Sequence, residues 1–241
     1  MSRIGSPTRL ILLLSLLGSL TSNAFADDAF IVLNPSTGRT ESVWSAVPLG
    51  GSSEVFFSVL QGSGWSPSEQ ITSNSLPDQQ PQVALTSQGD RKLVWWRNDT
   101  VDVVLFAEKS ASGGWWSTPV QVSDGQEDAR SPQVAVFGAT TFAAYEGVPT
   151  SGYRKVIVGK QDGPDPWPLT QVATSSQVSA LYIQLHSDSG HLWVEWVDSA
   201  IQLGWSEYLS GSWGTAEYET YGGADDIASG RGRIRSRVLG R

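Results

Sequence analysis

The sequence predicts an all-β protein built from four repeats of about 50 residues. Large aromatic residues recur at intervals of 51, 50 and 51 residues, at Trp44, Trp95, Tyr145 and Trp196. The run PQVAL at Pro81 returns as PQVAV at Pro132, again 51 residues later. No segment keeps a helical period, and Gly or Pro falls every few residues, which disfavours long helices.

Each repeat contains four short runs rich in Val, Leu, Trp and Phe, separated by polar or Gly-containing turns. This composition is typical of β-strands. The expected strands are 29–34, 41–47, 54–60 and 65–73; 81–87, 92–98, 101–108 and 115–123; 132–138, 140–147, 154–160 and 167–175; 179–187, 191–197, 201–208 and 211–220. Four strands per repeat indicate a β-propeller of about four four-stranded blades, because a blade covers its apolar faces by packing on the next.

Prolines mark the ends of the expected blades. Pro81 and Pro132 open the first strand of a blade, where a missing N–H is tolerated. Pro67, Pro119 and Pro168 fall in the last strand, which we expect to be the solvent-facing edge. We expect the ring to close with residues 29–34 near residues 215–220. In the alternative, the ring stays open and two chains complete it.

The chain divides into three parts. Residues 1–26 resemble a signal peptide, with two arginines, an apolar run of 11 residues and Ala24-Phe25-Ala26 as a cleavage site. Residues 27–226 form the propeller, and residues 227–241 form an Arg-rich tail that we expect to be disordered. The leader predicts a secreted or periplasmic protein without a transmembrane span. The chain has no Cys, so the core alone must hold the fold.

The charge distribution limits the partners of the protein. The formal net charge is −8, and residues 27–230 alone carry −15. Such a body repels nucleic acid and anionic membranes, so we expect no nucleic-acid partner, and only the tail could attract either. The tail carries five arginines in its last eleven residues. The tail could dock on the acidic body of a neighbouring molecule, on anionic lipid or on a polyanionic glycan, or it could be dispensable.

The repeats resemble those of bacterial secreted sialidase-like β-propellers of the Asp-box type, in particular their non-catalytic or lectin members. The likeness lies in the pattern GG-W-W-S-x-P, in the P-x-V-A strand and in the V-W strand. It covers roughly residues 29–220 and implies sugar binding in clefts between blades. One near match to the Asp box runs from His186 to Trp193. It falls between the first two strands of its repeat, so we interpret it as a turn.

The chain contains 11 tryptophans, which we divide by their place in the repeat. Those in the second strand, Trp44, Trp95 and Trp196, are expected to fill the space between blades. Those of the outer strand are the candidate ligand-binding residues, because an outer edge is more exposed. They are Trp65, Trp116, Trp167 and Trp213.

The predicted function is a secreted binding module for a glycan or another surface ligand. A sialidase-like hydrolase is the first alternative, and the resemblance would then imply three arginines, a Tyr–Glu pair and an Asp. Tyr145 and Glu146 offer such a pair, but none of the five arginines between residues 27 and 230 sits at a matched position. We therefore assign no catalytic residue. A structural subunit of an extracellular complex is the second alternative.

The sequence predicts no cofactor and no metal site. His186 and His191 flank one turn with Asp188, and acidic loops at 124–128 and 162–165 have oxygen ligands of the kind that Ca²⁺ prefers. Neither spacing matches a defined metal-binding loop, so we interpret these residues as solvated. The expected partners are a glycan or an extracellular protein, and the expected state is a monomer or a homodimer.

Overall fold

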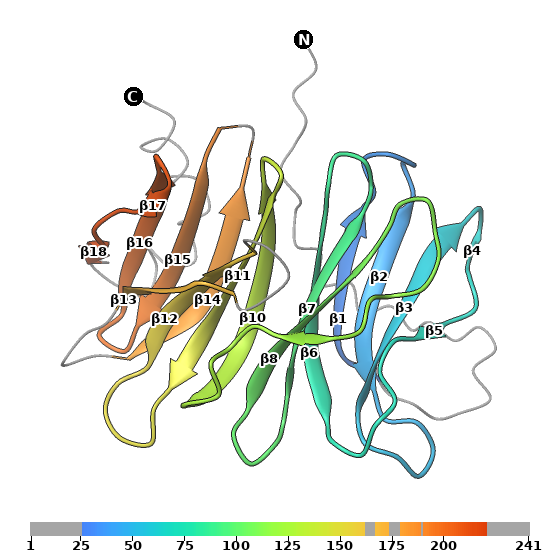
Figure 1. Ribbon diagram of the computed structural model, residues 1–241, viewed down its shortest axis with the longest axis horizontal. Helices are drawn as coiled ribbons and strands as arrows, with labels where there is room; N and C mark the ends of the chain where they lie inside the picture. Colours follow the sequence, from blue (N-terminus) through green and yellow to red (C-terminus); the bar gives the residue numbers. More distant parts are fainter. Residues whose placement is uncertain (1–25, 162–166, 174–178, 189, 221–241) are drawn as a thin grey trace.

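The computed structural model describes residues 26–161, 167–173, 179–188 and 190–220. Every regular element in these residues is a β-strand, and the strands form four antiparallel sheets that follow the order of the sequence (Figure 1). None of them forms a helix long and apolar enough to cross a membrane. The expected leader, apart from Ala26, and the expected tail lie outside the described residues. The all-β propeller of four blades is confirmed.

Each sheet is one blade, numbered here in chain order. Blade 1 contains β1 (Ala26–Leu33), β2 (Thr40–Ala46), β3 (Glu54–Gln61), β4 (Gly64–Trp65) and β5 (Glu69–Gln70). Blade 2 contains β6 (Asp78–Leu85), β7 (Arg91–Arg97), β8 (Val103–Lys109) and β9 (Val120–Gln121). Blade 3 contains β10 (Asp128–Phe137), β11 (Thr140–Val148), β12 (Lys155–Lys160) and β13 (Leu169–Ala173). Blade 4 contains β14 (Ala180–Ser187), β15 (Leu192–Asp198), β16 (Gln202–Leu209), β17 (Ser212–Trp213) and β18 (Glu217–Thr220).

The prolines sit differently from their predicted places. Pro81 and Pro132 lie inside β6 and β10, directly after Gln80 and Ser131, whose φ angles are 49° and 53°. The strand register shifts at both positions, so a bulge accommodates the residue that cannot donate a hydrogen bond. Pro119 and Pro168 precede the outer strands β9 and β13, which begin one residue later. The outer strands are therefore shorter than predicted.

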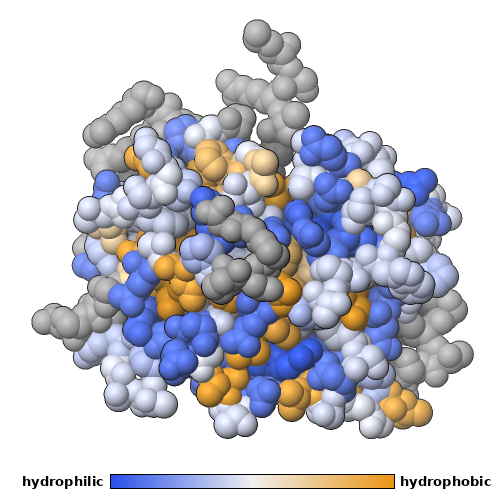
Figure 2. All heavy atoms as spheres, in the orientation of Figure 1, coloured by the Kyte–Doolittle hydropathy of each residue, from blue (hydrophilic) through white to orange (hydrophobic). Residues whose placement is uncertain are grey.

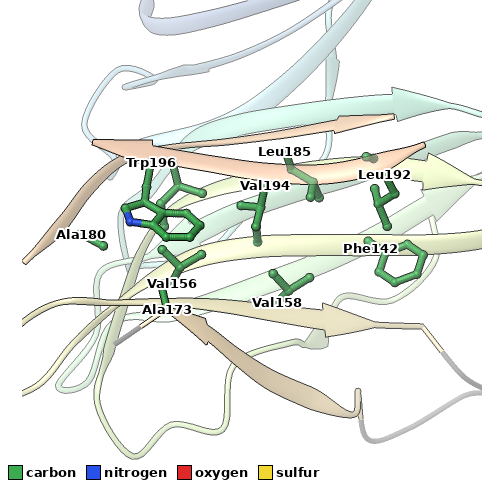
Figure 3. Close-up of a cluster of buried hydrophobic side chains, with 12 residues drawn as sticks. Phe142, Val156, Val158, Ala173, Ala180, Leu185, Leu192, Val194 and Trp196 are labelled. Carbon is green, nitrogen blue, oxygen red and sulfur yellow. The ribbon is translucent and has the colours of Figure 1, made fainter. Parts of the chain in front are cut away.

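The apolar core lies between the blades. Buried side chains from blades 3 and 4 face one another in Figure 3, with Trp196 and Val194 on one side and Val156 and Val158 on the other. Gly204 lies opposite Trp196 in the strand pairing, and a Cβ at Gly204 would overlap the indole ring. The absence of a side chain at this position thus leaves room for Trp196 in the core.

The four blades do not close into a ring. Extensive packing between the described strands joins only consecutive blades, with β1 and β2 on β6, β6 to β8 on β10, and β10 to β12 on β14. Figure 1 shows β1 on the right of the molecule and β17 and β18 at its far left. The expectation that residues 29–34 lie near residues 215–220 is therefore wrong. The described blades form an open row, and no described strand covers either of its end faces, which are called free faces below.

The free face of blade 1 is partly apolar. Ile31 of β1 is 40% exposed, whereas Val83, at the same place in β6, is 2% exposed because blade 1 covers it. On the same face Trp44 stacks on Phe56, with ring centroids 5.8 Å apart and planes 18° apart. Trp44 is only half-buried, while Trp95 and Trp196 are buried as predicted. The missing cover comes from the absence of a blade before blade 1 in the described row.

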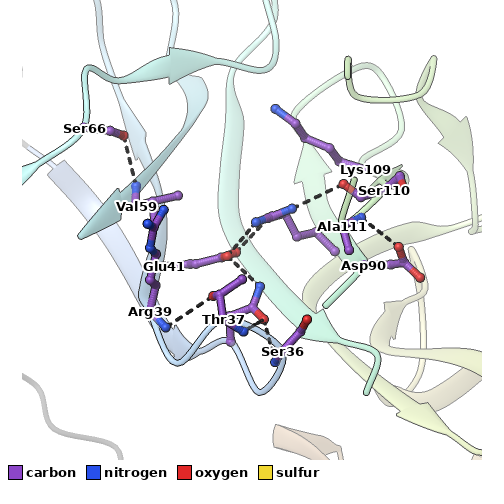
Figure 4. Close-up of polar contacts among 12 residues, drawn as sticks. Ser36, Thr37, Arg39, Glu41, Val59, Ser66, Asp90, Lys109, Ser110 and Ala111 are labelled. Carbon is purple, nitrogen blue, oxygen red and sulfur yellow. Dashed lines mark hydrogen bonds and ion pairs between the residues drawn. The ribbon is translucent and has the colours of Figure 1, made fainter. Parts of the chain in front are cut away.

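Ion pairs join the first two blades beside the apolar core. Glu41 is buried in β2 and accepts hydrogen bonds from Arg91 Nε and Nη2 of blade 2, at 2.7 and 2.6 Å. Figure 4 shows Glu41 reaching toward the neighbouring blade, where dashed lines mark these contacts. Asn34 donates a third hydrogen bond to the same carboxylate at 2.7 Å. A bidentate, fully paired carboxylate is the arrangement that makes a buried charge tolerable.

The surface is mixed in character. On the face shown in Figure 2, hydrophilic residues predominate and hydrophobic residues appear in small separate groups. Several large apolar side chains of the described chain are nevertheless well exposed, namely Leu33, Leu49, Trp115 and Tyr182. Leu33 belongs to the free face of blade 1, so part of this exposure follows from the open row.

Candidate ligand-binding clefts between the blades

Three of the four candidate ligand-binding tryptophans lie in contacts between blades. Each packs edge-to-face against a phenylalanine of the preceding blade. The pairs and centroid distances are Trp116 with Phe57 at 5.7 Å, Trp167 with Phe106 at 5.0 Å and Trp213 with Phe142 at 6.4 Å. Edge-to-face pairs of this kind stabilise a core beyond the area that they bury. The repeated tryptophan of the outer strand is therefore part of the blade interface.

The candidate tryptophans differ in how much surface remains for a ligand. Trp167 is 4% exposed, so its ring is almost entirely used by the contact between blades 2 and 3. Trp65, Trp116 and Trp213 are partly exposed. The indole N–H of Trp116 is buried and has no hydrogen-bond partner among the described residues, and the Lys109 ammonium lies 5.8 Å from the ring centroid. The structure therefore leaves ring surface available at three of the four positions.

Sequence reasoning missed Trp115, which is 91% exposed beside Trp116. The two residues are neighbours in an extended segment between β8 and β9, where one side chain faces the core and the other faces solvent. The doubled tryptophan in the run GGWWS was the available signal, because alternation along an extended chain places adjacent residues on opposite sides.

A depression of about 510 Å³ opens between blades 3 and 4. Its aromatic lining is Phe137, Phe142 and Tyr208, and its polar lining includes Lys160 and Asp188. The turn 138–140 between β10 and β11 forms one rim. The depression thus brings together side chains from the end of one blade and the middle of the next, which no local sequence motif could indicate.

Trp213 joins this depression through Tyr208. The two rings pack edge-to-face with centroids 5.4 Å apart, and Tyr208 also contacts Phe142 at 5.0 Å. Trp213 itself does not line the depression, but it supports the ring that does. Of the four candidate tryptophans, the structure thus places Trp213 next to this depression.

The polar rim of the depression is held in place by the turn between β14 and β15. Asp188 accepts hydrogen bonds at Oδ1 from the backbone N–H groups of Gly190 and His191, each at 3.0 Å. This is the segment that nearly matches the Asp box, and it lies between the first and second strands of its blade as predicted. The turn fixes the Asp188 carboxylate beside the aromatic wall.

The residues expected of a sialidase-like site do not converge. Four arginines are each paired with a carboxylate, as Arg91–Glu41, Arg97–Asp78, Arg130–Asp102 and Arg154–Glu146. Tyr145 and Glu146 are neighbours on β11, so their side chains point to opposite faces of the blade. Tyr145 packs with blade 2, while Glu146 accepts a hydrogen bond from the Tyr182 N–H of blade 4.

Tyr145 is the most strongly perturbed titratable group described. Burial raises the pKa of its phenol far above the ordinary value, and the charges of Asp124 and Glu127 raise it further. Its hydroxyl is buried and has no hydrogen-bond partner in the described chain. The group therefore stays neutral throughout the physiological range, and its packing role with Val94 and Trp96 explains its place.

The described part of the chain contains no cluster of metal-ligating side chains. No group of three His, Cys, Asp or Glu side chains there lies close enough to hold an ion. The acidic loop at 162–165 lies outside the described residues. His191 instead contacts Glu207, with Nδ1 2.6 Å from the carboxylate, and His186 lies 3.5 Å from Glu195.

Comparisons with known proteins locate the fold. No protein-family model matches the chain, and no curated protein matches it. Among solved structures, a neuraminidase-like protein from A/bat/Guatemala/164/2009 aligns with a TM-score of 0.58 at 9% identity, over 82% of this chain and 55% of the other. A family 117 glycoside hydrolase of the marine bacterium Zobellia galactanivorans aligns with a TM-score of 0.54 at 13% identity, covering 82% and 69%.

An exo-1,5-α-L-arabinanase from a bovine ruminal metagenomic library aligns with a TM-score of 0.53 at 10% identity, covering 77% of this chain and 76% of the other. At such low identities the likeness concerns the fold alone. Together with the four sheets, it assigns the chain to the β-propeller architecture found among glycoside hydrolases and neuraminidase-like proteins.

Proposed function

We propose that the protein is a glycan-binding module and that the cleft between blades 3 and 4 binds the sugar. The observation that carries the proposal is the depression of about 510 Å³ with three aromatic residues and two oppositely charged residues in its lining. Aromatic rings stack on the C–H faces of sugar rings, and a few placed polar groups fix orientation in ligand pockets. The volume falls within the usual range for a small-molecule site.

The proposal also concerns where the protein works. The leader-like segment 1–26 and the absence of cysteine are consistent with a secreted or periplasmic protein that folds without disulfides. The solved structures of similar fold include an arabinanase and a family 117 glycoside hydrolase, whose names refer to action on glycans. This supports an extracellular glycan as the ligand class.

A glycan array on the mature protein, followed by calorimetric titration of the best ligand, tests the proposal. Tyr208→Ala and Phe137→Ala each remove one aromatic wall, and we expect each to weaken binding by about two- to tenfold, since an aromatic contact contributes about 0.5–1.5 kcal/mol. Tyr153→Ala is the matched control, because Tyr153 is exposed and lies outside the depression. If both Tyr208→Ala and Phe137→Ala bind the glycan as tightly as the unchanged protein and keep its Tm, the cleft is not the binding site.

Hydrolysis remains the alternative, favoured by the fold shared with glycoside hydrolases. The same purified protein is incubated with the glycans that bind, and release of reducing sugar is followed over hours. A binding module leaves the glycan intact. Steady release of reducing ends, lost on substitution of a single carboxylate, would replace binding by catalysis as the function.

A further inference from the structure

The free face of blade 4 departs from the repeat in a specific way. The residue directly before the repeated aromatic residue of the second strand is paired with a residue of the third strand. In blades 1 to 3 both members of this pair are apolar, and both are buried against the next blade. These pairs are Val43–Phe57, Val94–Phe106 and Ala144–Val158, and the corresponding pair in blade 4 is Glu195–Trp205. No following blade covers it in the described row, and both residues are partly exposed.

Aromatic rings and carboxylates alternate across this face. Trp193 pairs with Glu207 and Glu195 pairs with Trp205 across β15 and β16, so all four side chains point to the same side of the sheet. The two tryptophans are thus diagonal neighbours, as are the two glutamates. Diagonal neighbours on one face lie roughly 7–8 Å apart, which is within reach of one or two sugar rings.

Several polar atoms of this face contact one another. The Trp193 Nε1–H donates to Glu195 Oε1 at 2.9 Å, and the His186 ring stacks on Trp193 with centroids 5.2 Å apart. Burial raises the pKa of Glu195, but His186 and the Trp193 N–H outweigh it and leave the pKa lowered, so the carboxylate is charged. His191 Nδ1 lies 2.6 Å from Oε1 of Glu207. Groups already engaged in such contacts lose little rotamer entropy when a ligand binds.

We propose that this face, made by His186, Trp193, Glu195, Trp205 and Glu207, is a second binding surface that takes neutral saccharides. The rings of Trp193 and Trp205 provide flat apolar surface for C–H faces, and the carboxylates accept hydrogen bonds from hydroxyl groups. Two carboxylates at one surface repel a sugar that carries carboxylate or sulfate, so the site selects against acidic glycans.

The surface is separate from the cleft between blades 3 and 4. Tyr208 and Glu207 are neighbours on β16, and alternation along the strand directs Tyr208 toward blade 3 and Glu207 toward the free face. Blade 4 therefore carries one ligand surface on each side. The second surface extends the proposed function but does not require the first, because no residue is shared between them.

The test uses the full mature chain and NMR detection of the indole N–H signals. Xylotetraose, cellotetraose and an arabinan tetrasaccharide are the neutral probes, and tetragalacturonate is the acidic probe. We expect at least one neutral probe to shift the Trp193 Nε1–H signal saturably. Trp205→Ala should weaken this binding at least tenfold, Glu195→Gln should weaken it severalfold, and Tyr208→Ala should leave it unchanged.

Trp44→Ala is the matched control, because Trp44 is a half-buried tryptophan on the other free face, paired with Ala29 and Phe56. Trp205→Phe keeps an aromatic ring and guards against loss of folding. Three results would overturn the proposal: no shift with any neutral probe, equal losses for Trp205→Ala and Trp44→Ala, or tighter binding of tetragalacturonate. If the protein sediments as a dimer and Trp205→Ala sediments as a monomer, the face is a contact between two protein chains instead.

Discussion

Trp44 and Trp95 occupy the same position of the repeat, 51 residues apart, yet only Trp95 is closed off from solvent. Trp95 lies between blades 1 and 2, and its Nε1–H donates to the buried carboxylate of Asp78 at 3.0 Å. Trp44 stacks on Phe56 on the free face of blade 1 and stays half-buried. The same residue type in the same local structure thus has two environments, because one copy lacks a preceding blade.

The two tryptophans should differ in what they contribute to stability. We expect Trp95→Ala to lower the free energy of unfolding by about 3–5 kcal/mol. The change leaves a cavity in a closed core and removes the indole N–H that donates a hydrogen bond to the buried Asp78 carboxylate. Trp44→Ala should cost about half as much or less, because solvent already reaches the ring. Urea unfolding of both variants measures the difference. Equal costs would mean that the free face of blade 1 is covered in solution.

Glu41 and Arg91 should hold blades 1 and 2 together. We expect Glu41→Gln to destabilise the protein by about 3–5 kcal/mol, because it leaves the buried guanidinium without a counter-charge. Glu69→Gln is the matched control, since the Lys109–Glu69 pair also joins these blades at 2.7 Å but is more exposed. It should cost about 0.2–1 kcal/mol. Chemical denaturation compares the two, and a cost below 1 kcal/mol for Glu41→Gln would contradict the buried pair.

His191 should make the stability of blade 4 depend on pH. The hydrogen bond to Glu207 raises the pKa of His191, desolvation opposes this, and the charges of Glu207 and Asp188 raise it further. A raised pKa in the folded state stabilises the protein fully below about pH 6.5, and this contribution is lost as the pH rises through the folded-state value.

NMR titration of the His191 ring protons measures this pKa directly. We expect a midpoint above 6.5 in the native protein and a return toward 6.5 in Glu207→Gln. Unfolding experiments at pH 6 and pH 8 should show lower stability at pH 8, and the difference should shrink in the variant. A midpoint at or below 6.5 would show that the contact with Glu207 does not persist in solution.

The fold was predictable because the residues that repeat along the sequence are the ones that fill the core between the blades. Trp95 and Trp196 recur at the blade spacing and are buried, and the short strands follow runs of β-branched and aromatic residues. Closure was not predictable, since whether the end blades meet depends on small angles between blades summed over the row. The extents of the outer strands also differed, because Pro119 and Pro168 stop the strand that they were expected to join.

The candidate sites were less predictable than the fold. The outer-strand tryptophans were identified as ligand residues because an outer edge was expected to be exposed, but Trp167 uses its place there to pack against Phe106 of the preceding blade. The cleft combines Phe137 of blade 3 with Tyr208 of blade 4, and only the packing of two blades brings them together. The face with Glu195 could have been found from the sequence, because Glu195 stands at a position of the repeat where blades 1 to 3 have an apolar residue.

The open row also determines how the molecule comes apart. A closed ring must break two interfaces to release any blade, whereas among the described strands blade 1 and blade 4 each pack extensively against one neighbouring blade only. Structures whose units touch only their neighbours unfold from the ends, with stability that adds up along the row. Amide hydrogen exchange should therefore be slowest in β7 and β11, at the centre of blades 2 and 3, and faster toward both ends. The two end blades, one with half-buried Trp44 on its outer face and the other with alternating tryptophans and glutamates there, become the units of local opening.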